Sequence, residues 1–280
     1  MKSKQELAAE QAEFWKGRGG QGWLAAYSRI DRSLAPYGEV LLQAAAAQPG
    51  EQVIDIGCGT GTTTAVLARA VAPGGHVLAI DISEPLIEAA RNHRVDNATF
   101  VLGDAARHPF HHRHYDLVFS RFGVMFFGDP ESAFRNFNQA LKPGGRLAFI
   151  CWRSTQENPW GTTAVRAAAP FLPPIPRPGP EDPGQYAFGD KSRVERILKA
   201  GGFRDASFEV VDRPVWMGPS IEEFLLGATR FGPLATAFAD AEPAAAEKAK
   251  QAIAEALKPH MGPEGIVMPG SCWLVRATPS

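Results

Sequence analysis

The chain has 280 residues, of which 45% are hydrophobic, enough for one large core or for one core and a smaller lobe. Its formal net charge is -1 at pH 7 and its lysines and arginines form no cluster, so we expect no nucleic-acid partner, which would need a cationic face. No apolar run reaches the roughly 18 residues of a membrane span, and the charged start "MKSKQELAAEQAEFW" is not a secretory signal.

The first half of the chain predicts helices followed by alternating strands and helices. Residues 4–47 are expected to be mostly helical, with a break at "KGRGGQG" (16–22). Strands are then predicted at 53–56, 76–81, 98–104, 115–122 and 146–152, and helices at 62–71, 84–92 and 131–145, the last ended by glycines. Strands that alternate with helices indicate a doubly wound α/β fold, in which a parallel sheet has helices on both faces.

The second half has a different pattern. Prolines in "FLPPIPRPGPEDPG" (171–184) exclude a regular helix or a central strand, so an extended surface connection is expected. A helix at about 190–200, a strand at 205–216, a helical stretch at 221–260 and a returning strand at 271–277 follow. The helices between the last two strands would form a lid over one end of the sheet.

Ligands of an open parallel sheet bind beyond the carboxyl ends of the strands. The first strand is followed by "DIGCGTG", in which Gly57, Gly59 and Gly61 allow a tight turn and a close approach of the backbone to a ligand. This pattern is one residue shorter than the dinucleotide motif G-x-G-x-x-G. Taken alone, it also fits an ordinary strand-to-helix turn.

The ends of the second and third strands indicate an adenosine site. Asp81 follows Gly61 by 20 residues, where a carboxylate can accept hydrogen bonds from both ribose hydroxyls. After Gly103, Asp104 can accept from the adenine amine, and the Ala105 amide can donate to a ring nitrogen. Ile82 can lie against the adenine face.

Five segments carry a family resemblance. "VIDIGCGTGTTT", "LAIDIS", "VLGDAARHPF", "YDLVFSRF" and "LKPGGRLAFICW" resemble the successive motifs of class I S-adenosylmethionine-dependent methyltransferases, and are most similar to the ubiquinone/menaquinone C-methylases. The resemblance covers about residues 50–152. It implies a Rossmann-like, mainly parallel seven-stranded sheet, S-adenosyl-L-methionine as cofactor and S-adenosyl-L-homocysteine as product. The chain would comprise an N-terminal helical cap (1–49), a cofactor-binding core (50–152), and the rest of the sheet with a substrate lid (153–280, the lid at about 153–190 and 213–265).

The resemblance also implies roles for individual residues. Asp55 and the turn around Cys58, with the Gly57 and Gly59 backbone, would hold the methionine end of the cofactor. Asp81 would bind the ribose, and Asp104 with Ala105 the adenine. The Ser120 carbonyl would face the methionine ammonium, and the cap would close over the cofactor with Trp15, Gln21 or Trp23 near it.

The acceptor side is less well defined. After the fourth strand, "SRFGVMFFGDP" lacks the Asn/Asp-Pro-Pro-aromatic motif of base-amine methylases. An apolar wall for a small hydrophobic acceptor is predicted from Phe122, Met125, Phe126, Phe127, Trp152 and Trp160. Ordinary core packing is the alternative for these residues.

Two polar candidates remain. His108, in "HPFHHRHYD", is the best histidine for a catalytic base, although we expect the histidines to lie on an exposed loop and to bind no metal. Arg121 either binds an acceptor carboxylate or forms a structural ion pair. Cys58 is expected to pack in the turn rather than to act as a nucleophile.

These observations predict methyl transfer to a small, largely apolar acceptor. Carbon or nitrogen is favoured over oxygen, because a neutral hydroxyl needs a base and no compelling base is present. The alternatives are an NAD-dependent oxidoreductase and a non-catalytic S-adenosylmethionine-binding module. The three widely spaced cysteines, Cys58, Cys151 and Cys272, favour a reducing, cytoplasmic location, and a monomer and a homodimer are equally compatible with the sequence.

Overall fold

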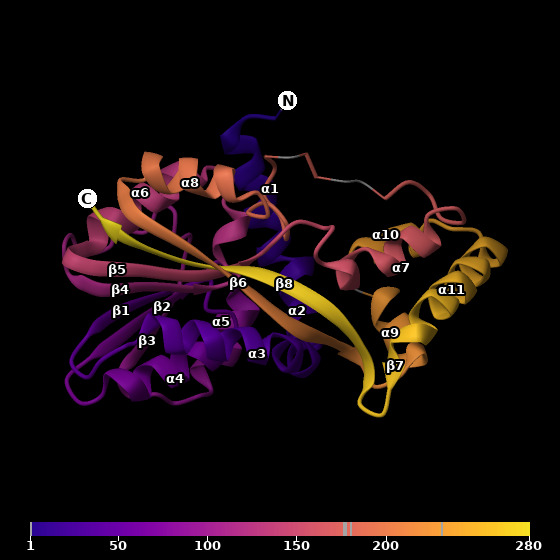
Figure 1. The fold of residues 1–280 in the computed structure, drawn as a ribbon, viewed down its shortest axis with the longest axis horizontal. Helices are drawn as coiled ribbons and strands as arrows, with labels where there is room; N and C mark the ends of the chain where they lie inside the picture. The colour runs from indigo at the N-terminus through magenta and orange to yellow at the C-terminus, as the bar shows by residue number, and fades with distance from the viewer. Residues whose placement is uncertain (1, 176–177, 180, 231) are drawn as a thin grey trace.

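The computed structural model describes residues 2–175, 178–179, 181–230 and 232–280, and its centre is a mixed sheet (Figure 1). Within the described residues, seven strands lie side by side in the order β3-β2-β1-β4-β5-β8-β6, and the short β7 pairs with β8. The strands are β1 Gln52–Ile56, β2 His76–Asp81, β3 Ala98–Leu102, β4 Tyr115–Arg121, β5 Leu141–Trp152, β6 Phe203–Gly218, β7 Met261–Gly262 and β8 Gly265–Pro279. The first five run parallel, and β8 is antiparallel to both β5 and β6. The predicted doubly wound α/β sheet is therefore confirmed.

Helices cover both faces of the sheet. In Figure 1, α6 (Pro130–Ala140) and α8 (Lys191–Ala200) lie on one face, and α3 (Tyr27–Ala45), α4 (Thr62–Val71) and α5 (Glu84–Arg91) lie on the other. The central strands β1 and β4 are buried on both sides, which is why they are short apolar runs rather than alternating ones. Their carboxyl ends, with that of β2, form the edge that carries the predicted site.

The N-terminal cap consists of α1 (Lys4–Lys16), α2 (Arg18–Ala25) and α3. The predicted break at 16–22 is present, and within this range Gly17 alone is not helical; Ala26 separates α2 from α3. Gly20 allows α2 to approach Ser83 closely, because a Cβ atom on Gly20 would lie 2.1 Å from Ser83 Oγ. The small residues of α2 thus let this helix pack directly onto the turn after β2.

A correction concerns "LKPGG". The predicted helix ends at Ala140, and Leu141 is already extended and begins β5. Proline fixes its own φ, and it disfavours a helical residue before it, so Pro143 prevents the helix from continuing through Lys142.

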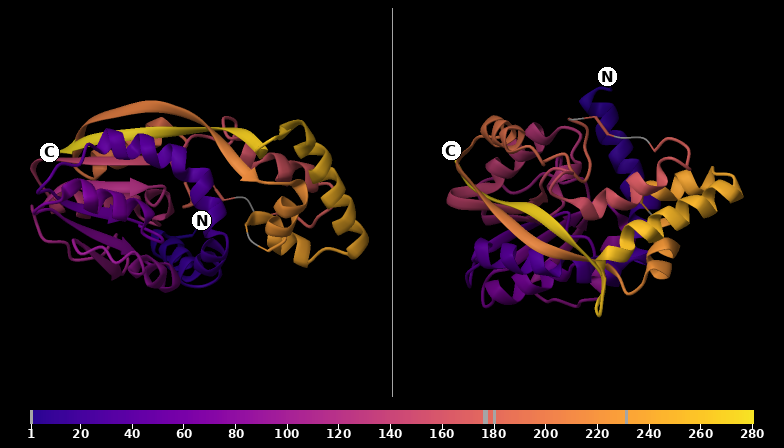
Figure 2. Two further views of the ribbon diagram at one scale, coloured as in Figure 1. Left: turned by 90° about the horizontal axis from the view of Figure 1, so that it is seen from below. Right: turned by 45° about the vertical axis from the view of Figure 1, so that its right-hand side comes forward.

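Beyond the sheet stands a helical lobe, formed by α7 (Thr163–Ala168), α9 (Ile221–Ala228), α10 (Pro233–Ala239) and α11 (Pro243–Leu257). Figure 2 shows that the long strands β6 and β8 extend from the sheet to this lobe. The lobe has an apolar core of its own, which includes Phe238, Ile253 and Leu257 with Ile266 of β8. The helices predicted between the last two strands are confirmed, whereas residues 213–218 belong to β6.

The connections are short or irregular. The described part of the chain has 3-10 turns at η1 (Val124–Phe126), η2 (Pro159–Gly161) and η3 (Lys258–His260). In the proline-rich stretch 171–184, the described residues form neither helix nor strand, and residues 176–177 and 180 lie outside the described part.

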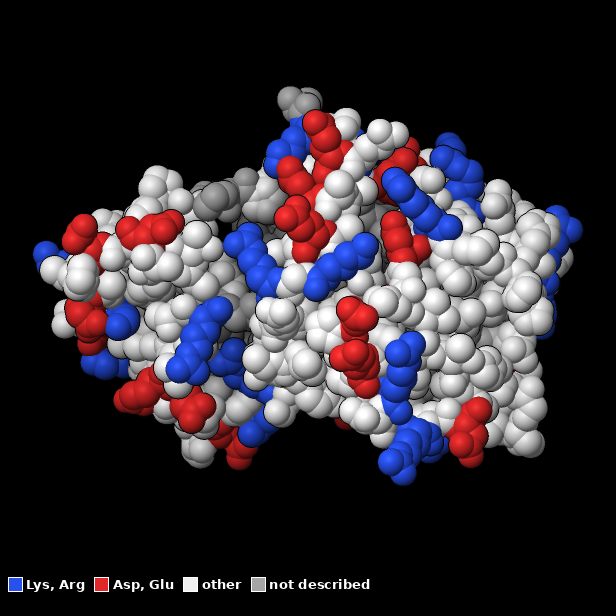
Figure 3. All heavy atoms as spheres, turned by 180° about the vertical axis from the view of Figure 1, so that it is seen from behind, with Lys and Arg blue, Asp and Glu red and all other residues white. Residues whose placement is uncertain are grey.

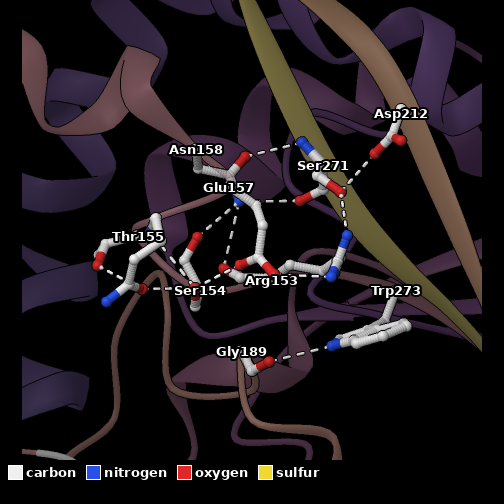
Figure 4. Close-up of polar contacts among 10 residues, drawn as sticks. Arg153, Ser154, Thr155, Glu157, Asn158, Gly189, Asp212, Ser271 and Trp273 are labelled. Atoms are coloured by element: carbon white, nitrogen blue, oxygen red, sulfur yellow. Dashed lines mark hydrogen bonds and ion pairs between the residues drawn. The ribbon is translucent and has the colours of Figure 1, made fainter.

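A buried polar cluster fastens the start of the lobe to the sheet (Figure 4). The Asn158 side chain is fully buried, and its amide nitrogen donates to the carbonyls of Arg153, Ser154 and Ser271. Its oxygen accepts from the Ser271 N–H at 2.9 Å and from Trp160 Nε1 at 3.1 Å. One side chain thus joins the segment after β5 to β8.

One face of the surface shows no dominant charge. On the face in Figure 3, basic and acidic side chains are interspersed, with no field of one sign. Of the helices that the structure describes, none combines the length and the apolar character needed to cross a membrane.

Candidate cofactor site

The glycine turn joins β1 to α4 at the carboxyl edge of the sheet. Gly57, Gly59 and Gly61 have φ values of +63°, +55° and +83°, in the left-handed region that favours glycine. A Cβ atom on Gly57 would lie 2.8 Å from Gly123 Cα. The backbone of the turn therefore packs directly against the backbone that follows β4. Ser120 Oγ fixes this junction, because it donates to the Ile56 carbonyl at 2.8 Å and accepts from the Gly123 N–H at 3.1 Å.

Asp81 and the glycine turn are brought together as the sequence predicts. Its carboxylate accepts from the Gly59 N–H and from the Ser83 N–H, each at 2.9 Å. An ionised carboxylate has about four acceptor positions, so it can accept further donors while it keeps these two. Burial raises the pKa of Asp81 above its ordinary value.

Asp55 lies at the end of β1 beneath the start of α4. One carboxylate oxygen accepts from Thr64 Oγ1 at 2.7 Å and from Thr63 Oγ1 at 3.3 Å, and the other oxygen has no partner. Burial, the largest influence, raises the pKa of Asp55 to about 6. This carboxyl group therefore titrates near neutrality, unlike an ordinary aspartate.

A small cavity lies between the cap and the glycine turn, with a volume of about 30 Å³. Two contacts hold its walls together: Tyr27 Oη lies 3.0 Å from Thr62 Oγ1, and Arg121 Nη2 lies 3.0 Å from Asp31 Oδ1. The cavity is lined by Trp23, Tyr27, Ile30, Asp31 and Leu34 from the cap and by Gly57, Cys58, Gly59, Thr60, Thr63 and Arg121 from the core. Two alternatives were predicted for Arg121, an acceptor carboxylate or an ion pair within the protein. The structure shows the ion pair, with Asp31.

The end of β3 lies next to that of β2. The Gly103 N–H donates to the Asp81 carbonyl at 2.9 Å, which places Asp104 and Ala105 directly beyond this junction. Asp104 caps its own turn by accepting from the Ala106 N–H, and Asn136 of α6 donates to the Ala105 carbonyl at 3.1 Å. Asn136 is a supporting residue that the sequence did not single out. Ile82 is half-buried beside Asp81.

An aromatic group joins the cap to the segment after β4. The Trp15 ring lies 5.0 Å from that of Phe126 and 5.8 Å from that of Trp23, measured between ring centroids. Trp15 Nε1 is buried and has no hydrogen-bond partner. Trp15 and Trp23 thus reach the predicted edge, whereas Gln21 is exposed on α2.

The other residues of the predicted apolar wall divide into two groups. Phe122, Met125 and Trp152 are buried in the main core, where the Phe122 and Trp152 rings stack at 4.7 Å. Trp160 is half-buried and packs on Trp152 with its ring centroid 4.7 Å away, and Phe127 is half-buried against Phe137. Phe122 also has a φ of +63°, an uncommon conformation for a bulky residue.

The predicted histidine loop joins β3 to β4. The His108 ring packs on Phe110 with centroids 4.7 Å apart, and burial lowers its pKa. His111, His112 and His114 are exposed. In the part of the chain that the structure describes, no three His, Cys, Asp or Glu side chains are placed to hold a metal ion. Cys58 is buried, and burial raises the pKa of its thiol well above the ordinary value.

Unpaired polar atoms test whether this edge suits a polar cofactor. Among the described residues, four buried side-chain atoms lack a hydrogen-bond partner, and three belong to Trp15, Asp55 and Ser83 around this edge; the fourth is Arg153 Nε. Buried polar groups are normally satisfied, so unpaired ones need an explanation such as a bound ligand. A molecule with an amino-acid end and a nucleoside end offers both donors and acceptors. The residues present therefore fit such a group.

Several residues of this edge were not predicted. Tyr27, Asp31, Thr63 and Ser83 are missing from the sequence-based set. Tyr27 and Asp31 belong to the cap, which is distant in the chain and gives no local motif, whereas Thr63 and Ser83 lie inside two of the quoted motifs. The run Thr62–Thr64 was the one available signal, since hydroxyl residues at the start of a helix commonly make polar contacts there.

Comparison with known proteins adds a family assignment to this geometry. A family model described as "Methyltransferase domain" matches residues 54–149. The demethylmenaquinone methyltransferase of Corynebacterium kroppenstedtii is 31% identical over 170 residues, covering 58% of this chain and 71% of that protein. The ubiquinone/menaquinone biosynthesis C-methyltransferase UbiE of Ectopseudomonas mendocina is 36% identical over 114 residues, covering 39% of this chain and 44% of that protein. The matched region thus spans less than half of the second relative.

Solved structures share the fold. The YcgJ protein from Bacillus subtilis superimposes with a TM-score of 0.56 at 18% identity, covering 89% of this chain and 99% of that one. At this identity the likeness concerns the fold alone, and it extends beyond the region that the family model matches.

Proposed function

Since this chain belongs to the class I S-adenosylmethionine-dependent methyltransferases, we propose that it methylates a carbon or nitrogen atom of a small, largely apolar acceptor. The cofactor supplies a methyl group already activated by the positive charge on sulfur. The protein's own contribution is then mainly to align the two molecules and to exclude water. The predicted NAD-dependent oxidoreductase is set aside, because the family is one of methyltransferases.

The proposed cofactor position follows the order of the strand ends. Asp81 would accept from the ribose, with Ile82 beside it, and Asp104 with the Ala105 amide would bind the adenine. Support comes from the free acceptor positions of Asp81, whose carboxylate is fixed by two backbone N–H groups. Asp55, the glycine turn and the Ser120 carbonyl would hold the methionine end.

The observation that carries the proposal is the set of unpaired buried atoms around one edge. Trp15 Nε1, Asp55 Oδ1 and Ser83 Oγ come from three separate parts of the chain. Asp55 lies at the end of β1, just before the glycine turn. The Ser83 N–H binds Asp81, which also binds Gly59, and the Trp15 ring packs on Trp23 of the cavity lining. A single elongated polar ligand across this edge would satisfy them together.

The acceptor is proposed to approach between Phe126 and Trp160, toward the helical lobe. Both rings are half-buried, and each continues a larger aromatic group: Trp15 and Trp23 beside Phe126, and Trp152 beside Trp160. An aromatic wall favours a planar apolar acceptor. The two curated relatives are named for methylation of a demethylmenaquinone and for C-methylation in quinone biosynthesis, which favours carbon.

Reaction chemistry supports carbon or nitrogen over oxygen. An electron-rich carbon or an amine needs little acid–base help, whereas a neutral hydroxyl needs a positioned base. His108 packs against Phe110 beyond β3 and beside Gly103, on the side proposed for the adenine, so we do not propose it as a base for the acceptor. We propose a small-molecule acceptor rather than a nucleic acid, supported by the interspersed charges in Figure 3. The three buried free cysteines support a cytoplasmic location.

Two measurements test the proposal. Isothermal titration calorimetry with S-adenosylhomocysteine should show binding. If no binding is detected at millimolar ligand, the proposed cofactor site is wrong. The chain is then incubated with methyl-labelled S-adenosylmethionine and a panel of quinols, phenols and amines, and products are identified by mass spectrometry. A carbon- or nitrogen-methylated product is expected. Oxygen methylation alone, or cofactor binding with no transfer to any acceptor, would contradict the acceptor proposal.

A further inference from the structure

The cavity beside the glycine turn contains a largely buried ion pair. Arg121 from the end of β4 and Asp31 from α3 both line it, and their side chains are only 14% and 25% exposed. The Arg121 side chain crosses the α3 backbone at Gly38, where a Cβ atom would lie 3.2 Å from its Cδ. Removing two charges from water is costly, so fold stability alone is a weak explanation for a pair in this position.

The same cavity contains a second feature that favours a carboxylate. Helix α4 begins here, and its N-cap residue Gly61 provides no side-chain cap. The first N–H groups of a helix have no intrahelical partner, and they favour a negatively charged group. Thr63 of this first turn lines the cavity together with Arg121, which places a guanidinium and a helix start on one wall.

The positive charge of Arg121 and the negative charge of Asp31, which both line this cavity, are complementary to a zwitterion. We propose that Arg121 and Asp31 select the amino-acid end of the cofactor, Arg121 binding its carboxylate beside the start of α4 and Asp31 binding its ammonium group. This inference rests on the proposed function and assigns Arg121 to the methyl donor rather than to an acceptor carboxylate. A cavity of about 30 Å³ holds about one water molecule. The two side chains therefore separate to admit the zwitterion, and each exchanges its partner for an opposite charge of the ligand.

The test compares ligands that differ only in the amino-acid end. Isothermal titration calorimetry is performed with S-adenosylhomocysteine and with 5′-methylthioadenosine, which has the nucleoside and the sulfur but no amino acid. The variants are Arg121→Gln, Asp31→Asn, the conservative Arg121→Lys, and the charge exchange Asp31→Arg/Arg121→Asp. Binding of 5′-methylthioadenosine serves as the measure of an intact fold in each variant.

We expect Arg121→Gln and Asp31→Asn each to weaken S-adenosylhomocysteine binding about ten- to a hundredfold, the range for losing a charged hydrogen bond. Binding of 5′-methylthioadenosine should change less than about threefold on the same scale. Arg121→Lys should retain part of the affinity for S-adenosylhomocysteine, since it keeps the charge without the planar fork.

Two results would overturn the inference. One is an equal loss of affinity for both ligands, which would make the ion pair merely structural. The other is full recovery of S-adenosylhomocysteine affinity in the charge-exchange variant, because a structural pair tolerates exchange whereas a bound zwitterion would meet like charges. If the unaltered chain binds neither ligand, the proposed function itself fails, and that outcome is separate from these two.

Discussion

Asp81 and Gly59 are joined by a hydrogen bond of 2.9 Å between the Asp81 carboxylate and the Gly59 N–H, which links the end of β2 to the middle of the glycine turn. The Asp81 side chain therefore stabilises the glycine turn and, in the proposed function, also binds the ribose of the cofactor. Each glycine of this turn has a positive φ, and Asp81 supplies one of the contacts that hold this conformation.

Replacing Asp81 by alanine should weaken the binding of S-adenosylhomocysteine and of 5′-methylthioadenosine to a similar extent, by about a hundredfold or more. Both ligands contain the ribose, so this pattern differs from the one expected for Arg121. Calorimetry with the two ligands measures the effect, and Asp96→Ala on an exposed turn is the matched control. Unchanged affinity for either ligand would rule out the ribose role.

Asp55 should make stability depend on pH with a defined sign. Its folded-state pKa of about 6 lies above the ordinary 3.8, so the folded chain binds this proton more tightly than the unfolded chain does. The stabilisation is fully present below about pH 4 and is lost as the pH rises through about 6, at most about 3 kcal/mol.

Replacing Asp55 by asparagine should remove this dependence. Relative to the unaltered chain, the variant should gain free energy of unfolding between pH 4 and pH 7, and it should bind S-adenosylhomocysteine more weakly. Urea denaturation at the two pH values measures the first effect, with Asp96→Asn as control. A constant difference in stability between variant and unaltered chain at both pH values would contradict the prediction.

Asn158 should be essential to the stability of the chain. Its fully buried amide contacts Arg153, Ser154, Trp160 and Ser271, so Asn158→Ala leaves several buried groups without a partner (Figure 4). We expect a loss of about 3 kcal/mol in the free energy of unfolding. Chemical denaturation measures it, and Thr155→Ala, on the exposed side of the same loop, should change stability by less than about 0.5 kcal/mol. Similar small losses in both variants would show that the cluster is dispensable.

Phe122 offers a test of backbone strain. Both Phe122→Ala and Phe122→Gly remove the ring that stacks on Trp152, but only alanine keeps a Cβ atom at a φ of +63°. The glycine variant should therefore be the more stable of the two by about 1 kcal/mol, the reverse of the usual order. Thermal unfolding monitored by circular dichroism decides between them, and an alanine variant that equals or exceeds the glycine variant would show that the residue is not strained.

The parts of the fold that local patterns control were predictable. The helix over Thr62–Val71 and the strand over His76–Asp81 have the predicted bounds, because glycines, apolar residues and chain direction all specify them locally. Two differences, the helical conformation of Gly20 and the end of the helix before Leu141, arose where glycine or proline had two possible meanings. Gly20 is required by contact with Ser83, and only the folded chain shows that contact.

The residues of the candidate site also fall into a part that could be predicted from the sequence and a part that could not. Asp55 and Asp81 lie at the carboxyl ends of β1 and β2, and Asp104 lies just after β3, so their common edge could be inferred from topology. Asp31 and Tyr27 reach this edge from the cap, and no spacing in the sequence fixes how the cap packs. Side chains that join distant segments have to be read from the structure.

The pairing of β6 with β8 persists to the point where the lobe begins, since Gly218 lies opposite Ile266. The insertion that carries α9, α10 and α11 therefore leaves and re-enters the sheet at neighbouring positions. A short turn could replace it without altering the register of either strand, and helices from a related chain could be grafted onto the same two strand ends. The insertion proposed to face the acceptor is thus attached to the sheet at two neighbouring strand positions.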